Sequence, residues 1–347
     1  MPSVLAWPAG EGPEAQPYQA LLYGELRKRG WTVKDFTPGR LLRHPQELIH
    51  VHWPDLVLLE RRPPLRFLKT AAFLALFALA RLRGRRLVWT LHNTELRDEQ
   101  RSPWGRVYVR ALIGLCSGLV LLSPRHVELL SRRARRKPLA VVPHPELRTA
   151  YGEPREGRAA KERLGIGSDE LVVGFFGKVR PYKQLSALAS AFAGLPGPGL
   201  RLLVAGEFDA SCAALATGLR HADRTSLLDR HVPRDEVAWV LAAMDLVVLP
   251  YREIGNSGVA LLALSYARRL LAPASAPAMS ELRKSVGGNW VQLYEGELQP
   301  HHLRQALERR PETSEPDLAA FAPGRVGELT DRFLRSLLAA APQPPRP

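Results

Sequence analysis

The sequence predicts an α/β protein of two doubly wound domains, and three observations support this prediction. Apolar runs typical of buried parallel strands alternate with helical patterns along the whole chain. The 347 residues exceed the usual size of one domain, and a hydrophobic content of 46% is ample for two cores. The alternation breaks once, between residues 149 and 167, where a Gly- and Pro-containing stretch precedes a short charged helix. The break separates the two predicted domains.

The first predicted domain, residues 1–150, begins with a strand, a loop over residues 13–18 and a helix over residues 19–29. Short apolar runs rich in Val, Leu and Trp predict its strands. They are expected at residues 3–7, 31–36, 48–53, 86–91 and 118–122.

The second predicted domain covers residues 151–311 and repeats this organisation without repeating the sequence. Its strands are expected at residues 171–177, 200–206, 245–250, 269–273 and 290–294. The remaining segment, residues 312–347, contains a helix over about residues 317–338 and a Pro-rich tail. We expect this helix to cross between the domains.

Two features bear on the compartment. The first six residues lead into a Pro/Gly-rich loop rather than into the charged start and apolar core of a secretory signal. Cys116 and Cys212 are far apart and match no metal or redox spacing. We therefore expect a cytoplasmic protein.

The formal charge of +15 is concentrated in the first half of the chain. Residues 61–86 contain eight Lys or Arg and no acid, and residues 125–137 contain six more with only Glu128 opposing them. Residues 73–80 between the first basic clusters are apolar on every helical face, too short to span a bilayer but suited to a helix lying on an anionic membrane surface. The alternative is a helix packed in the core. The basic stretches lack the interleaved aromatics of single-strand binding, so we expect no nucleic-acid partner.

Two strand–turn–helix segments, residues 171–183 and 247–258, carry the strongest functional signal. Each places polar residues at the carboxyl end of a predicted parallel strand, where open α/β sheets bind ligands. Cations and helix amino termini are the usual means of holding a diphosphate. The predicted donor-binding residues are Gly177, Lys178, Arg180, Lys183, Glu253, Asn256, Ser257 and Gly258.

Five segments, in order, resemble the nucleotide-sugar glycosyltransferases of the GT-B fold, in particular the bacterial group 1 enzymes called family 4. The most specific is residues 177–183, which look like the family's Gly-Arg-x-x-x-x-Lys donor-phosphate segment with Lys178 at the Arg position. The others are residues 17–19, 90–93, 122–124 and 142–145. The resemblance implies two Rossmann-like domains facing a cleft, with the acceptor on the first domain and the donor on the second.

The resemblance also implies roles for single residues. Glu253 matches the first glutamate of the family's Glu-x7-Glu motif, which contacts the donor sugar, whereas the second position is Leu261. His92 matches a histidine that faces the donor sugar, so we take His92 and Glu253 as the catalytic candidates. His144 is either an acceptor-side or a hinge residue. With it, Gly10 and Tyr18 are the predicted acceptor-side residues.

No metal or other cofactor is expected. His50 and His52 share one face of a strand, but no further ligand spacing supports a metal site. The chain also lacks an Asp-x-Asp motif, so cationic side chains would stabilise the departing nucleoside diphosphate. An inverting enzyme would need a base, for which Glu11, Glu14 and Asp98 are available.

The sequence thus predicts a metal-independent glycosyltransferase that moves a hexose from a nucleoside diphosphate sugar to a lipid-linked or surface-polysaccharide acceptor. We expect it to contact an anionic membrane surface through residues 61–86, on the inner face of the cell membrane. Two alternatives stay open. One is a nucleotide-sugar epimerase of the same fold, and the other is a non-catalytic subunit that holds a partner enzyme at the membrane.

Overall fold

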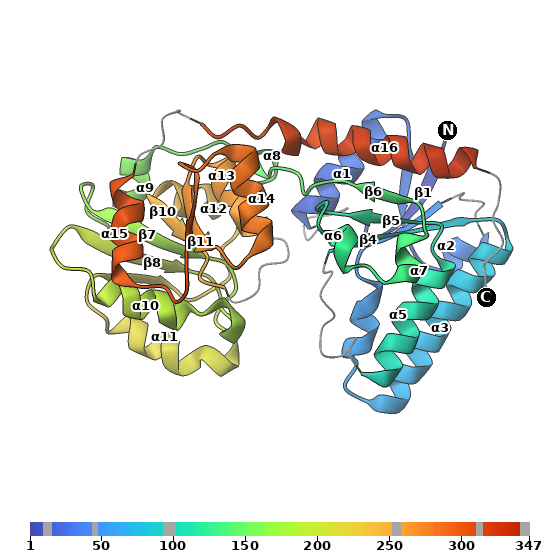
Figure 1. The fold of residues 1–347 in the computed structure, drawn as a ribbon, viewed down its shortest axis with the longest axis horizontal. Helices are drawn as coiled ribbons and strands as arrows, with labels where there is room; N and C mark the ends of the chain where they lie inside the picture. Colours follow the sequence, from blue (N-terminus) through green and yellow to red (C-terminus); the bar gives the residue numbers. More distant parts are fainter. Residues whose placement is uncertain (10–15, 44–47, 93–101, 252–257, 310–314, 341–347) are drawn as a thin grey trace. The chain divides into compact units, whose positions relative to one another are not determined.

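A computed structural model describes residues 1–9, 16–43, 48–92, 102–251, 258–309 and 315–340. The chain divides into two compact units, of which the first comprises Met1–Pro145 and Ala319–Pro347 and the second Glu146–Leu318. Each unit contains one parallel sheet of six strands (Figure 1). The predicted α/β class with two doubly wound sheets is confirmed.

The sheet of the first unit has the strand order β2-β1-β3-β4-β5-β6, with every neighbouring pair parallel. Chain direction along the sheet reverses after β2, so right-handed crossovers place α1 on one face and α3 and α5 on the other. The strands are β1 (Ser3–Trp7), β2 (Thr32–Asp35), β3 (Leu48–Val51), β4 (Arg86–Leu91), β5 (Gly118–Leu121) and β6 (Leu139–Val141). The helices are α1 (Pro17–Lys28), α2 (Pro38–Arg43), η1 (Pro54–Leu59), α3 (Pro63–Leu82), α5 (Pro103–Leu115), α6 (His126–Leu129), α7 (Arg132–Arg135), η4 (Ala319–Phe321) and α16 (Pro323–Ala339).

Each face of this sheet buries its own core, because alternate side chains of a strand point to opposite faces. Leu5 packs with Phe77 of α3 and Tyr108 of α5, whereas Val4 packs with the residues of α1 and α16. The contact of α16 depends on Gly118 of β5, since a Cβ atom there would lie 2.7 Å from the ring of Phe333. The C-terminal helix, expected to cross between the domains, thus belongs to the first unit.

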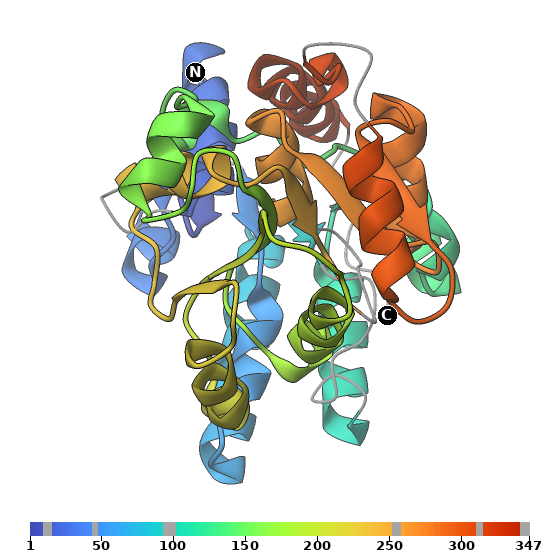
Figure 2. The same cartoon turned by 90° about the vertical axis from the view of Figure 1, so that its left-hand side faces the viewer.

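The sheet of the second unit has the order β12-β11-β10-β7-β8-β9 and is also parallel throughout. Figure 1 shows α12, α13 and α14 on one face and α10 and α11 on the other, and Figure 2 shows α15 beside α10. The strands are β7 (Leu171–Phe176), β8 (Leu200–Ala205), β9 (Thr225–Leu228), β10 (Leu246–Val248), β11 (Arg269–Pro273) and β12 (Val291–Tyr294). The helices are α8 (Arg148–Tyr151), α9 (Gly157–Arg163), η2 (Pro181–Lys183), α10 (Leu185–Ala193), η3 (Ala210–Cys212), α11 (Ala213–Arg220), α12 (Arg234–Ala242), α13 (Gly258–Ser265), α14 (Pro277–Val286) and α15 (Pro300–Glu308).

The ten predicted strands are all present, and the structure adds β6 and β9. Both additions are short edge strands whose residues are only partly buried, so they lack a continuous apolar run. The last helix was also placed too early, because it begins at Pro323 rather than near residue 317. Pro fits the first turn of a helix, where its missing N–H has no intrahelical partner.

Helix α3 contains the apolar stretch that the sequence left between two interpretations. One of its faces packs in the core through Thr70, Phe77 and Ala80. The opposite face leaves Leu68 and Leu82 exposed at 66% and 76% of their surface. Among the described residues, no helix is both long and apolar enough to cross a membrane.

Candidate active site

The carboxyl ends of β3 and β4 in the first unit carry a cluster of histidine and tyrosine side chains. His50 and His52 are 0% and 1% exposed and both contact the hydroxyl of Tyr23, at 3.0 Å from Nδ1 of His50 and 2.7 Å from Nε2 of His52. The prediction that these two histidines share a face is confirmed. Tyr23 comes from α1, which packs over the sheet at this end.

His92 lies at the end of β4 and is held from three sides. Its Nε2 lies 3.0 Å from Nδ1 of His52. Its ring stacks on Trp53, with centroids 4.5 Å apart and an angle of 25° between the planes. The ring of Tyr18 stands nearly perpendicular to it, with the ring centroids 4.9 Å apart. The ring orientation of His92 is therefore determined by hydrogen bonding and by aromatic packing together.

Tyr18 joins the predicted acceptor-side residues to this cluster. Its ring lies 4.9 Å from that of His144, whose Nδ1 lies 2.8 Å from the carbonyl oxygen of Pro145. Among the described residues, neither the buried Tyr18 hydroxyl nor the side-chain amide atoms of Gln19 have a hydrogen-bond partner. Unpartnered buried polar groups cost about 1–3 kcal/mol each, so such groups are candidates for pairing with a ligand or an ordered water. Gln19 lies in the segment 17–19 that resembles the family, but it was not among the predicted site residues, because its burial depends on the tertiary fold.

Burial keeps these histidines neutral near pH 7. It lowers the pKa of His50 to about 3 and, with the nearby His144 and His50, that of His92 to about 3. Burial lowers the pKa of His144 to about 4, and burial with the neighbouring His50 and His92 lowers that of His52 well below 6.5. A neutral imidazole can accept a proton or a hydrogen bond from a substrate hydroxyl.

The cluster contains histidines but not the geometry of a metal site. Within the ranges that the structure describes, no three His, Cys, Asp or Glu side chains are placed to hold a metal ion. The hydrogen bonds between His50, Tyr23, His52 and His92 already occupy ring nitrogens that a metal would require.

In the second unit, the predicted donor-phosphate segment forms the turn after β7. Gly177 has a φ of +100°, which an L side chain rarely adopts, so glycine is required at this turn. A Cβ atom there would lie 3.5 Å from both Nζ of Lys183 and a methyl group of Val259. Val259 follows Gly258, the first residue of α13. The turn thus brings together Gly177, Lys183 and the amino terminus of α13.

Lys183 is the most unusual charge in this unit. It is 8% exposed, and in the described part of the chain no carboxylate pairs with it. Its Nζ faces the rings of Tyr251 at 5.1 Å and Phe175 at 5.8 Å. Burial, together with the charge of Arg180, lowers the pKa of Lys183 to about 8. A buried cation beside a helix amino terminus is suited to bind an anionic group such as a diphosphate.

The other two predicted cations lie in different surroundings. Lys178 is exposed and pairs with Glu207 at 3.3 Å, and Arg180 is exposed. Sequence spacing placed these two with Lys183 on one anion, whereas only Lys183 is buried against the end of β7. Lys178 and Arg180 remain predicted donor contacts at the rim of the turn.

A hollow of about 570 Å³ lies at the carboxyl ends of β10, β11 and β12. This volume is in the range of small-molecule sites. Gln184 at the start of α10, Tyr251 after β10 and Tyr294 of β12 contribute to its walls. The Tyr251 hydroxyl is buried and has no hydrogen-bond partner within the described part of the chain. Because Tyr251 also contacts Lys183, the hollow adjoins the predicted phosphate site.

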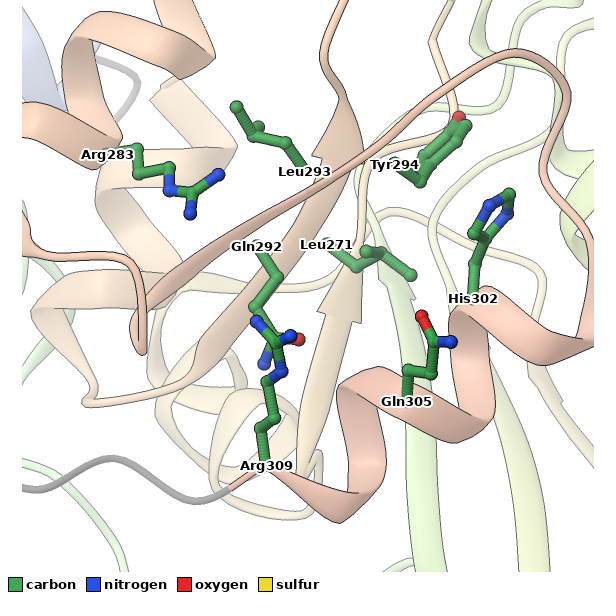
Figure 3. A pocket seen from close by; sticks show the side chains of 8 residues that line it. All are labelled: Leu271, Arg283, Gln292, Leu293, Tyr294, His302, Gln305 and Arg309. Atoms are coloured by element: carbon green, nitrogen blue, oxygen red, sulfur yellow. The ribbon is translucent and has the colours of Figure 1, made fainter.

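A second hollow, between α14, α15 and β12, has a volume of about 70 Å³ (Figure 3). Arg283, Gln292 and Arg309 line it. Its volume is that of roughly two water molecules, so it is too small for a nucleotide.

Several predicted site residues lie outside the described ranges. They are Gly10, Glu253, Asn256 and Ser257, together with the candidate bases Glu11, Glu14 and Asp98. Leu261, which occupies the position of the family's second glutamate, lies in α13 and is 6% exposed. The structure therefore places an apolar core residue where the motif has a carboxylate.

Comparisons with known proteins place the chain in a family. No family model matches the sequence. The chain is 30% identical over 329 residues to the GDP-mannose:glycolipid 4-beta-D-mannosyltransferase of Xanthomonas campestris pv. campestris, covering 92% of this chain and 88% of that protein. It is 31% identical over 156 residues to the D-inositol 3-phosphate glycosyltransferase of Mycobacterium ulcerans (strain Agy99), covering 43% of this chain and 33% of that protein.

Solved structures agree on the fold. HepE from Anabaena, crystallised with UDP-glucose, aligns with a TM-score of 0.66 at 17% identity over 98% of this chain and all of that chain (100%). Sucrose-phosphate synthase from Thermosynechococcus elongatus aligns with a TM-score of 0.65 at 16% identity over 97% of this chain and 94% of that chain. The protein therefore belongs to the nucleotide-sugar glycosyltransferases of the GT-B fold, among which it resembles the group 1 enzymes.

Proposed function

We propose that this glycosyltransferase moves a hexose from a nucleoside diphosphate sugar to a lipid-linked saccharide. The observation that carries the proposal is Lys183, a buried cation beside Gly177 and the start of α13. The full-length relative from Xanthomonas is named for GDP-mannose and a glycolipid, which makes GDP-mannose the first donor to test.

In this proposal the second unit holds the donor. Lys183 and the amide groups at the start of α13 stabilise the diphosphate as its bond to the sugar breaks. Lys178, Arg180 and the undescribed Glu253, Asn256 and Ser257 complete the donor site, without a metal ion. Leu261 leaves the ribose without the carboxylate that the family motif provides, so other groups must recognise the nucleoside.

The first unit supplies the acceptor side. Tyr18, Gly10 and His144 contact the acceptor, and His92, with its neutral ring, is a catalytic residue. The unpartnered hydroxyl of Tyr18 and amide of Gln19 are groups that a sugar hydroxyl can pair with.

The α3 helix supports a location at an anionic membrane surface. Its exposed side carries Leu68, Ala72, Ala75 and Leu82, and Lys69 and Arg83 flank this side. An exposed apolar helical face bordered by cations is the arrangement of a helix that lies in a lipid interface. A lipid-linked acceptor would then be presented to the enzyme at that surface.

The test combines binding and transfer. Purified protein is mixed with GDP, UDP, ADP or dTDP, and the melting temperature is measured, followed by incubation of the matching labelled sugar nucleotides with a glycolipid extract. We expect one diphosphate to raise the melting temperature of the wild type, and we expect label to enter the lipid phase. Lys183→Ala should lose the stabilisation and the transfer, whereas Lys284→Ala, on the exposed side of α14, should keep the stabilisation and the transfer.

Conversion of the donor sugar without any acceptor would favour the epimerase. No response to any diphosphate would favour the non-catalytic subunit.

A further inference from the structure

His92 is the end of a chain of hydrogen bonds that runs back through the interior of the first unit. From His92, the contacts pass to His52 at 3.0 Å, to the Tyr23 hydroxyl at 2.7 Å and to His50 at 3.0 Å. The last contact joins Nε2 of His50 to the hydroxyl of Thr90 at 2.8 Å. All four distances are those of good hydrogen bonds.

All the hydrogen bonds of this series point the same way, and either of the two opposite directions satisfies every group. His50 and His52 each use both ring nitrogens, and a neutral imidazole has one donor and one acceptor. Tyr23 bridges them with one hydroxyl proton, so it donates to one ring and accepts from the other. If His52 donates to His92, then the Tyr23 hydroxyl donates to His52, and the opposite assignment reverses every bond. Either way, the position of the proton on His92 is tied to groups that no substrate reaches.

These inner groups are fully buried. Tyr23, His50 and Thr90 are each 0% exposed, and His52 is 1% exposed. Burying polar groups costs free energy unless each finds a partner, and apolar residues would fill the same space without that cost. Each member of the set is paired with the next, and the set leads to the ring of His92.

We propose that His52 is a positioning residue for His92, and that Tyr23 and His50 behind it fix which ring nitrogen of His92 carries the proton. The proposal rests on the proposed function, in which His92 is a catalytic residue. His52 does not touch substrate. It acts by holding the His92 ring in one orientation and one tautomer, as outer partners do for functional imidazoles.

The first experiment interrupts the series of hydrogen bonds with Tyr23→Phe, which removes the bridging hydroxyl and keeps the ring. We expect kcat to fall by about tenfold or more while KM for the donor stays within about twofold. Tyr108→Phe is the matched control, because Tyr108 is also 0% exposed in this unit and its hydroxyl donates to the backbone carbonyl oxygen of Pro54 at 2.8 Å rather than to a histidine ring. Tyr108→Phe should keep kcat within about twofold of the wild type.

A second pair of variants keeps the test decisive if Tyr23→Phe folds poorly. His52→Asn retains a polar group near the position of Nδ1, whereas His52→Leu does not. We expect His52→Asn to keep more of kcat than His52→Leu at similar stability. Equal kcat in these two variants would overturn the proposal.

A spectroscopic readout separates this proposal from the proposed function. Nitrogen-15 chemical shifts of the imidazole report the tautomer without any turnover, with the His92 signals assigned from their absence in His92→Ala. We expect one dominant tautomer of His92 in the wild type and in Tyr108→Phe, and an averaged signal in Tyr23→Phe. Unchanged His92 signals in Tyr23→Phe would overturn the positioning role. Full transfer activity of His92→Ala would instead overturn the proposed site.

Discussion

Lys183 and Tyr251 meet at the carboxyl end of the second sheet, with Nζ of the lysine 5.1 Å from the centroid of the tyrosine ring. The face of an aromatic ring partly compensates a cation for lost water. The compensation is incomplete, because burial still lowers the pKa of Lys183 from 10.5 to about 8. A bound diphosphate would supply the missing counter-charge.

The first prediction concerns the stability of the protein without ligand. The lowered pKa of Lys183 means that the unfolded chain binds more protons between pH 8 and 10.5, so the free energy of unfolding should rise with pH in that window. Lys183→Met should remove this rise and should stabilise the protein below pH 8 by up to about 3 kcal/mol. Denaturant unfolding at a series of pH values measures both. A destabilised Lys183→Met variant would show that the folded protein neutralises this charge.

The second prediction concerns donor binding at the same residue. The affinity for the nucleoside diphosphate should fall as the pH rises above about 8, because Lys183 then loses its charge. Calorimetric titration between about pH 7 and about pH 9.5 should show this fall in the wild type and in Lys284→Met, and a weak, flat profile in Lys183→Met. A wild-type affinity that does not change with pH would remove Lys183 from the diphosphate site.

The sequence predicted every inner strand of the two sheets but missed two of the edge strands. Strands such as Leu171–Phe176 are buried on both faces and form continuous apolar runs, which identify them without any tertiary information. The edge strands Leu139–Val141 and Thr225–Leu228 have one neighbour each and only partly buried residues, so they have no such run. They form because the neighbouring strand offers hydrogen bonds, which local sequence does not record.

The candidate site was predicted in part for a similar reason. Spacing identified Lys183, His92 and the shared face of His50 and His52. It could not show that Tyr23, which is 27 residues from His50, links the two rings, since that contact depends on how α1 packs over the sheet. The same histidine pair that suggested a metal in the sequence is an internal hydrogen-bond relay in the folded unit.

The third prediction concerns the unpartnered hydroxyl of Tyr251. Tyr251→Phe should leave the ligand-free protein as stable as the wild type or more stable by about 1 kcal/mol, because an unsatisfied buried hydroxyl is removed. Tyr266→Phe is the comparison, since the Tyr266 hydroxyl donates to the carbonyl oxygen of Gly152 at 2.6 Å, and its loss should destabilise by about 1 kcal/mol. Thermal unfolding of both variants checks the difference in sign. If Tyr251→Phe proved the less stable of the two, the hydroxyl would have a partner in solution.

The fourth prediction is a loss of stability in acid that arises from the buried histidines. The pKa of His50 and of His92 is lowered to about 3 and that of His144 to about 4, whereas unfolded histidines titrate near 6.5. The unfolded chain therefore binds more protons below pH 6.5, and stability should decrease as the pH falls from 6.5 towards 4. Each such histidine contributes about 1.4 kcal/mol per pH unit. His144→Asn should reduce the slope of the unfolding free energy against pH by one proton, whereas an unchanged slope would mean that His144 is solvated.

The fifth prediction concerns the exposed face of α3. Leu68→Glu with Leu82→Glu replaces two apolar side chains that are 66% and 76% exposed, so the fold should tolerate the change. Each leucine that enters a lipid interface contributes up to about 1.5–3 kcal/mol, so the double variant should bind vesicles at least about tenfold more weakly. Co-sedimentation with vesicles of anionic and of zwitterionic lipid measures this.

The wild type should prefer the anionic vesicles and should dissociate as salt screens the flanking Lys69 and Arg83. Leu171→Glu is the control, because Leu171 is also exposed, at 43%, but belongs to the second unit. Equal vesicle binding by the wild type and the double variant would show that α3 does not contact the lipid.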